Sequence, residues 1–335
     1  MKKIINHAED FVTDFMEGIE LAYGSQVKML DPEKRILVRS TPVRSGKVGV
    51  VTGGGSGHLP LFLGYVGQGM LDGCAVGNVF ASPSSQKMHE MIQACDFGGG
   101  VLCLFGNYGG DKMNFGMACE MAEFDDIKTA SVRVRDDVAS APNAEKDRRR
   151  GVAGTVYAFK IAGAAAEDGK PLEEVAAITQ KALDNVRTMG VALTPCIVPE
   201  VGKPTFQIQN DEIEIGMGIH GEPGIEVRKM MTADEIAHLI VSKITEDMPL
   251  HEGDEVSVMV NGLGATPLEE QLIVYRSVAK ILTESGISIY MPHIGEFATS
   301  MEMAGLSITI FRLNEELKKY LDAPASTPFY TNSNR

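Results

Sequence analysis

The stretch KVGVVTGGGSGH, residues 47–58, decides the fold. Its first six residues form a short apolar run typical of a buried β-strand, and the glycines that follow predict a loop at the carboxyl end of that strand. Open α/β sheets bind ligands at this end of their strands. The stretch therefore predicts an α/β fold with a ligand-binding loop at 53–58, and a flexible turn without a ligand is the alternative.

A nucleotide is the first ligand to consider for a glycine loop after a strand. The loop at 53–58 lacks the Lys-Ser/Thr ending of a P-loop, and His58 and Pro60 stand where a dinucleotide-binding fingerprint needs its third glycine. The sequence therefore gives no support for nucleotide binding by this chain.

Strand-like runs alternate with helical patterns on both sides of this stretch, as in α/β proteins. In the first 190 residues, further strands are expected at 100–105 and 127–134, and helices at 8–22, 84–96, 155–168 and 171–190. The alternation predicts two α/β domains with a substrate cleft between them. The N-terminal domain, residues 1–190, carries two glycine loops, and the C-terminal domain, residues 191–335, carries a third.

The composition is that of a globular protein of 335 residues with a net charge of −14. Hydrophobic residues make up 44% of the chain, which excludes global disorder, and the acidic balance argues against binding of nucleic acid. No apolar stretch approaches the roughly 20 residues of a spanning helix, so we expect no membrane association. The five cysteines contain no C-x-x-C pair, which predicts reduced, buried thiols and a cytoplasmic protein.

Two glycine loops at the expected sheet edge carry chemically active side chains. Ser56 and His58 lie in the first, and GNYGGD, residues 106–111, follows the next apolar strand and ends in Asp111. Parallel strands end at a shared edge, so we expect Asp111 on the same side of the sheet as His58. A carboxylate beside an imidazole can act as a general base, and the same carboxylate can also cap the next helix.

The third loop, GMGIHGEPG at 216–224, places His220 among four glycines. Such a histidine is poorly placed for core packing, and its small neighbours allow a ligand to approach closely. A neutral imidazole can ligate a metal, accept a proton or attack an electrophile. His293, in the run ISIYMPHIG, is a weaker candidate for the same cleft.

The chain resembles one family, the dihydroxyacetone kinases, in the segments GKVGVVTGGGSGH, NYGGDKMNF, RRGVAGTV, VPEVGKPTF, IEIGMGIHGEPG and VNGLGATPLEE. The resemblance covers nearly the whole chain and is to the free-standing substrate-binding subunit of the phosphoenolpyruvate-dependent bacterial type. It implies a homodimer that holds the ketone, a nucleotide-binding kinase subunit that holds ADP or ATP with magnesium, and a phosphocarrier subunit of the phosphotransferase system. No cofactor and no metal ion is expected on this chain.

The resemblance also implies roles for the site residues. His220 corresponds to the histidine that attacks the substrate carbonyl and forms a covalent hemiaminal, which selects small ketones and aldehydes over glycerol. Asp111 corresponds to the acid that accepts the proton of the phosphorylated hydroxyl, and His58 to a second imidazole that hydrogen-bonds the substrate. The loop that wraps the bound triose corresponds to Gly55, Ser56 and Gly57.

Two positions depart from the family pattern: Leu59 stands where an acid is usual, and Gly106 stands where a ligand-contacting lysine is common. They leave three interpretations open: a dihydroxyacetone-phosphorylating subunit, a paralogue for another small ketose such as erythrulose, and a dihydroxyacetone-sensing co-regulator. Retention of His58, Asp111 and His220 favours catalysis over sensing.

A hypothesis from another class is a metal-dependent hydrolase. Its ligands would be His58, Asp111, His220 and His293. These side chains suit a divalent ion, but none of their spacings is a recognised metal motif. Metal analysis of the purified protein decides this alternative.

Overall fold

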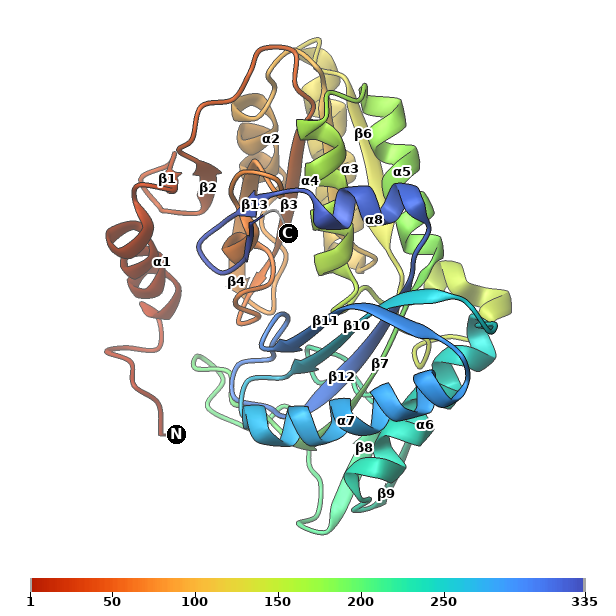
Figure 1. Cartoon of the computed structure of the whole chain (residues 1–335). Coiled ribbons are helices and arrows are strands. Elements are labelled where there is room, and N and C mark those ends of the chain that lie inside the picture. Colours follow the sequence, from red (N-terminus) through yellow and green to blue (C-terminus); the bar gives the residue numbers. More distant parts are fainter. Residues whose placement is uncertain (1, 334–335) are drawn as a thin grey trace. The chain divides into compact units, whose positions relative to one another are not determined.

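The computed structural model describes residues 2–333 and divides them into two compact units, each with a six-stranded sheet (Figure 1). The first unit comprises the described residues up to Val134, then Val156–Ala182, and the described residues from Glu316 onward. The second comprises Arg135–Thr155 and Leu183–Glu315. The α/β class is as expected, but neither unit is contiguous, so the observed division differs from a single boundary at residue 190.

The strands of the first unit are β1 (Val27–Met29), β2 (Ile36–Arg39), β3 (Gly49–Ser56), β4 (Gly73–Val79), β5 (Val101–Gly106), β6 (Thr129–Val134), β13 (Ala325–Ser326) and β14 (Thr331–Asn332). Its helices are α1 (Phe11–Tyr23), η1 (Leu63–Tyr65), α2 (Ser85–Ala94), α3 (Gly109–Phe124), α4 (Thr155–Glu167), α5 (Leu172–Asp184) and α8 (Glu315–Asp322), of which α4, α5 and α8 each have one end in the second unit.

The main sheet of the first unit has the strand order β1-β2-β4-β3-β5-β6. β3 lies between β4 and β5 and is parallel to both, with Val51 opposite Gly73 on one side and Cys103 on the other. Met91 of α2 and Phe115 of α3 pack into the core on one face of the sheet, and Figure 1 shows α4 and α5 on its other side. Burial on both faces explains why β3 and β5 are almost wholly apolar or glycine.

We expected the glycines at 53–55 to form a loop, but they are the last part of β3. Gly55 pairs with Gly77 of β4, and a Cβ at Gly55 would lie 2.6 Å from the backbone nitrogen of Ala81. Glycine is required here because another stretch of backbone passes too close for a side chain. The loop therefore begins only after Ser56.

Replacing Gly55 by alanine is expected to lower the free energy of unfolding by about 1–3 kcal/mol, because the backbone around Ala81 must move to admit the methyl group. Chemical denaturation measures this loss. Gly116→Ala is the matched control, since a Cβ there meets nothing within 4 Å and alanine favours the helix α3. Equal stability of the two variants would contradict the close-approach explanation.

The strands of the second unit are β7 (Val186–Thr194), β8 (Glu212–Ile215), β9 (Glu226–Lys229), β10 (Glu255–Gly262), β11 (Ser288–Gly295) and β12 (Ala304–Arg312). Its helices are η2 (Asn143–Arg148), α6 (Ala233–Asp247) and α7 (Leu268–Glu284).

The sheet of the second unit has the order β11-β10-β12-β7-β8-β9, in which only β10 and β11 are parallel. α6 and α7 lie against each other and cover the sheet, as Figure 1 shows. The core between them includes Ile240, Val258, Val278 and Ile308. This packing fixes β8, whose end carries the third glycine loop.

The helix expected at 171–190 ends at Asp184, and its last part belongs to strand β7. Gly190 resembles a helix stop, but Met189 and Val191 are buried in the core of the second unit, where β7 pairs with β12. Burial and pairing with a distant strand therefore override the helical pattern.

Cysteines lie mainly in the interior of the first unit. All five in the chain are free thiols and four are buried, as predicted, whereas Cys119 is partly exposed. Across residues 2–333, no helix has the length and apolarity that crossing a membrane requires.

Candidate functional site

Three neighbouring strands of the first unit end at one edge of its sheet. β4, β3 and β5 are parallel, and the chain passes from β3 to β4 on one side and then to β5 on the other. Ligands of open α/β sheets bind where the strand order diverges in this way. His58 follows β3 and Asp111 follows β5, so the structure places both predicted residues at this edge.

Two aromatic rings hold the imidazole of His58. The ring of Phe80, which follows β4, stacks on it with centroids 4.8 Å apart, and the Phe62 ring meets it edge-on at 6.0 Å. The Leu61 N–H donates to the His58 carbonyl oxygen at 2.9 Å. Only 1% of the His58 surface is exposed, so its ring is packed in place rather than solvated.

Ser56 ends β3 with a buried hydroxyl. The Phe80 N–H donates to the Ser56 carbonyl oxygen at 3.0 Å, but no group within residues 2–333 hydrogen-bonds to the Ser56 hydroxyl. Buried hydroxyls normally have a partner, so this one is suited to a ligand. The binding role expected for Gly55, Ser56 and Gly57 stays a prediction, which this hydroxyl supports.

Asp111 lies in the first turn of α3. We expected this helix to begin after Asp111, but it begins at Gly109. Asp111 as a whole is 6% exposed, and it is not the helix N-cap, which is Tyr108. The Asn114 amide on the same helix donates to the Pro83 carbonyl oxygen at 2.9 Å, which ties α3 to the segment after β4. The positive end of the helix dipole favours an ionised carboxylate at this position.

In the second unit, the loop after β8 holds His220 beside a carboxylate. Nδ1 of His220 lies 2.9 Å from Oε1 of Glu222, and the His220 backbone N–H donates to Oε2 at 2.9 Å. Burial opposes ionisation of Glu222, but the hydrogen bond and charge of His220, with backbone N–H donors, lower its pKa to about 2. The carboxyl group is therefore ionised at neutral pH and can only accept hydrogen bonds.

This carboxylate determines the tautomer of His220. Because Glu222 cannot donate, the ring hydrogen must lie on Nδ1, and the lone pair of the neutral ring lies on Nε2. Such an imidazole can act as a nucleophile at Nε2, and a carboxylate behind it would stabilise the positive charge that develops during attack. Sequence reasoning missed Glu222, although a glutamate two residues after the histidine in GIHGEPG was the available signal.

Contacts from other segments of the second unit fix this loop. The Ser300 hydroxyl donates to the Ile219 carbonyl oxygen at 2.5 Å, and the Arg150 guanidinium donates to the Gly216 carbonyl oxygen at 2.9 Å. Gly218 leaves the room that Glu222 needs, since a Cβ there would lie 2.1 Å from Glu222 Oε2. The sequence therefore holds His220 and Glu222 together through a loop that admits no side chain at Gly218.

His293 lies within β11 and not in a glycine loop. Its Nδ1 is 3.5 Å from Ser257 Oγ, and Phe297 meets its ring edge-on at 5.9 Å. In the part of the chain that the structure describes, no three His, Cys, Asp or Glu side chains form a group that could hold a metal ion. The metal-dependent hydrolase hypothesis gains no support from these observations.

Comparison with known proteins gives the family, because the Dak1 domain matches residues 17–329. The chain belongs to the Dak1 family. One relative is the dihydroxyacetone-binding subunit DhaK of PTS-dependent dihydroxyacetone kinase 1 from Listeria innocua, which is 46% identical over 322 residues, covering 96% of this chain and 97% of the relative. L-erythrulose kinase of Pectobacterium atrosepticum is 42% identical over 334 residues, covering 98% of this chain and 56% of the relative.

Solved structures support the Dak1 assignment. The dihydroxyacetone kinase of C. freundii superposes with a TM-score of 0.90 at 33% identity, covering 99% of this chain and 60% of that one. The dihydroxyacetone kinase operon co-activator DhaQ also superposes with a TM-score of 0.90, at 31% identity, covering 98% and 100%. The resemblance drawn from the motifs is thus confirmed at the level of family and fold.

Proposed function

We propose that this chain is the dihydroxyacetone-binding subunit of a phosphoenolpyruvate-dependent dihydroxyacetone kinase. The observation that carries the proposal is the pairing of His220 with an ionised Glu222, which makes Nε2 a nucleophile in a glycine loop. Membership of the Dak1 family and a 46% identical relative named as a dihydroxyacetone-binding subunit support the choice of substrate.

The first step forms a covalent hemiaminal. Nε2 of His220 attacks the carbonyl carbon of the ketone, the π electrons move to the carbonyl oxygen, and the alkoxide takes up a proton. The ring becomes positively charged as the C–N bond forms, and the ionised Glu222 stabilises this charge through its hydrogen bond with Nδ1–H. The proton that the alkoxide takes up comes from solvent. Glycerol has no carbonyl carbon, so this step selects ketones and aldehydes.

Replacing Glu222 by glutamine is expected to weaken adduct formation roughly 10- to 100-fold. The reason is the loss of a charged hydrogen bond, which contributes about 1.5–3 kcal/mol. Titration calorimetry with dihydroxyacetone measures the change in affinity. Glu226→Gln, on the neighbouring strand β9, is the control and should bind as the wild type does, because Glu226 pairs with Arg228 and not with His220. Unchanged affinity in Glu222→Gln would refute the role of the carboxylate.

The second step transfers a phosphoryl group to a substrate hydroxyl. We propose that Asp111 accepts the proton of that hydroxyl, since it is buried at the start of α3 with the helix dipole favouring its carboxylate. His58, held against Phe80, hydrogen-bonds the substrate and assists the proton transfer. The buried hydroxyl of Ser56 binds a second oxygen of the ketone.

Partner subunits complete the reaction in this proposal. A nucleotide-binding kinase subunit holds ADP or ATP with magnesium and supplies the phosphoryl group, and a phosphocarrier subunit restores it. This chain itself forms a homodimer. The support is the resemblance to the phosphoenolpyruvate-dependent type, together with a glycine-rich segment at 53–57 that lacks the residues of a nucleotide site.

An erythrulose-phosphorylating subunit is the second candidate. It is favoured by the 42% identity with an L-erythrulose kinase and by Gly106 and Leu59, which replace the usual lysine and acid of the family. Loss of the long cationic side chain opens space for a fourth carbon. One methylene contact is worth only about 1–3 kcal/mol, so activity on both sugars is expected rather than a clean switch.

The deciding experiment pairs the chain with its own nucleotide-binding and phosphocarrier subunits. Phosphorylation of dihydroxyacetone, glyceraldehyde, D-erythrulose, L-erythrulose and glycerol is then compared by kcat/KM. Turnover of dihydroxyacetone without glycerol supports the proposal, and a preference for an erythrulose supports the second candidate. Binding of dihydroxyacetone without turnover of any sugar would instead indicate a sensor of the kind that the co-activator's name suggests.

A further inference from the structure

Cys103 and Cys119 lie against each other where α3 packs on β5. Their sulfur atoms are 3.7 Å apart, in hydrogen-bond contact. Cys103, in the middle of β5, has 0% of its surface exposed, whereas Cys119, in the second half of α3, is partly exposed. Neither sulfur has a part in the reaction proposed above, so the pair needs a separate explanation.

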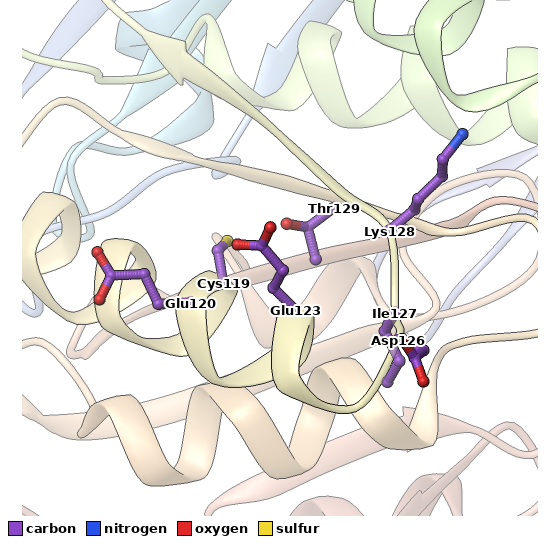
Figure 2. Close-up of a pocket in the computed structure, with 7 residues that line it drawn as sticks. All are labelled: Cys119, Glu120, Glu123, Asp126, Ile127, Lys128 and Thr129. Atoms are coloured by element: carbon purple, nitrogen blue, oxygen red, sulfur yellow. The ribbon is translucent and has the colours of Figure 1, made fainter.

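The Cys119 sulfur opens into a shallow pocket of about 460 Å³ formed by the end of α3, the following turn and the start of β6 (Figure 2). Figure 2 shows Glu123 and Thr129 lining this pocket with Cys119, and Lys128 pointing away from it. With Glu120 and Asp126 also at the pocket, carboxylates outnumber the single ammonium group. The surrounding potential is negative and favours uncharged over anionic reagents.

Hydrogen bonds favour the thiolate form of Cys119. The sulfurs of Cys119 and Cys103 share a hydrogen bond, and the Ser131 hydroxyl lies 3.8 Å from the Cys119 sulfur. The hydrogen bond with Cys103 lowers the pKa of Cys119 to about 6. Burial acts in the opposite direction, and hydrogen bonds with Thr129 and Ser131 add to the lowering. The hydrogen bond between the two sulfurs, together with burial, raises the pKa of Cys103. The two thiols are thus chemically unequal, and only Cys119 combines thiolate character with access to solvent.

We propose that Cys119 is an oxidation site for small uncharged peroxides and that Cys103 resolves it to a disulfide. The Cys119 thiolate attacks a peroxide oxygen, the O–O bond breaks, and the sulfur is oxidised by two electrons to a sulfenic acid while the leaving oxygen is protonated. Cys103 then attacks the Cys119 sulfur, the S–O bond breaks, and the hydroxide leaves with the Cys103 proton as water. With hydrogen peroxide, two thiols and one peroxide give one disulfide and two waters.

The order of the two steps follows from burial. Peroxide reaches Cys119 through the pocket, and Cys103 is enclosed in the core between β5 and α3. The disulfide brings the sulfurs from 3.7 Å to about 2.05 Å, which draws the second half of α3 towards β5. The reduced state is regained by exchange with a dithiol.

The test is mass spectrometry of the whole protein treated with hydrogen peroxide. The wild type should lose two hydrogen atoms and show a peptide crosslink between Cys103 and Cys119. Cys103→Ala should stop at the sulfenic acid and be captured on Cys119 by dimedone, and Cys119→Ser should leave Cys103 as a thiol. Cys95→Ala is the matched control, a buried cysteine on the same unit whose loss should leave the crosslink unchanged.

Two outcomes overturn the proposal. One is equal oxidation of Cys119 and the buried Cys95 in the folded protein. The other is dimedone capture on Cys119 in the wild type as complete as in Cys103→Ala, which would mean that Cys103 does not resolve the sulfenic acid. The choice of oxidant is tested with glutathione disulfide, an anion that should react at least tenfold more slowly than the peroxide at equal concentration. None of these readouts depends on kinase activity.

Discussion

Replacing His220 by alanine is expected to abolish the covalent adduct with dihydroxyacetone and to lower turnover by roughly 10³-fold or more. The reason is that Nε2 of His220 forms the covalent bond to the ketone. The loop at 216–224 contains no second imidazole that could pair with Glu222 in its place. Carbon NMR with a labelled carbonyl carbon follows the adduct directly, because attack converts that carbon from trigonal to tetrahedral. Residual binding should distinguish poorly between dihydroxyacetone and glycerol.

His293→Ala is the control for this result. His293 belongs to the same unit, but its ring lies beside Ser257 and Phe297 in β11 rather than beside Glu222. The control should form the adduct as the wild type does. A tetrahedral adduct that persists on another residue in His220→Ala would show that a different group is the nucleophile.

Replacing Asp111 by asparagine should separate binding from turnover. Hemiaminal formation needs a neutral imidazole, whereas phosphoryl transfer needs the substrate hydroxyl to lose its proton, and general-base catalysis contributes about 10²- to 10⁴-fold. We therefore expect kcat to fall by that factor while the adduct and its affinity stay within about twofold. Reconstituted phosphorylation and the same NMR experiment measure the two properties independently.

Glu120→Gln provides the matched change on the same helix. Glu120 is an exposed carboxylate in the second half of α3, away from the turn that holds Asp111. Its variant should retain full turnover, which controls for the lost negative charge on α3. If Asp111→Asn turned over at near wild-type rate, another group would have to accept the proton, and His58 would be the next to test.

The sequence carries enough information to place half of the candidate site. KVGVVT and VLCLF are continuous apolar runs, and such runs indicate neighbouring buried strands whose carboxyl ends share an edge. That argument puts His58 and Asp111 after neighbouring strands at one edge of the sheet, as the parallel pairing of β3 with β5 shows, while their roles stay predictions. His220 was found by a different signal, the density of glycines around an imidazole in GMGIHGEPG.

What sequence reasoning missed depends on contacts between distant segments. The glycines at 53–55 look like a loop because the local sequence does not show that the backbone at Ala81 lies too close for a side chain. The residues of β7 look like the end of a helix because their pairing partner, β12, lies more than a hundred positions away. The Cys103–Cys119 contact was missed for a related reason, since it depends on how one helix packs on one strand.

The division of the chain has a consequence for its synthesis on the ribosome. The first unit is interrupted after Ala182 and resumes with its last segment at Glu316, 134 positions later (316 minus 182). That segment includes most of α8, whose Tyr320 carbonyl oxygen accepts a hydrogen bond from the buried Lys160 at 2.6 Å. At about 5–20 residues per second, Tyr320 is synthesised roughly 8–32 s after Lys160, its partner 160 positions earlier. The core of the first unit therefore closes only after the second unit has been translated, the reverse of the order in which domains usually fold during synthesis.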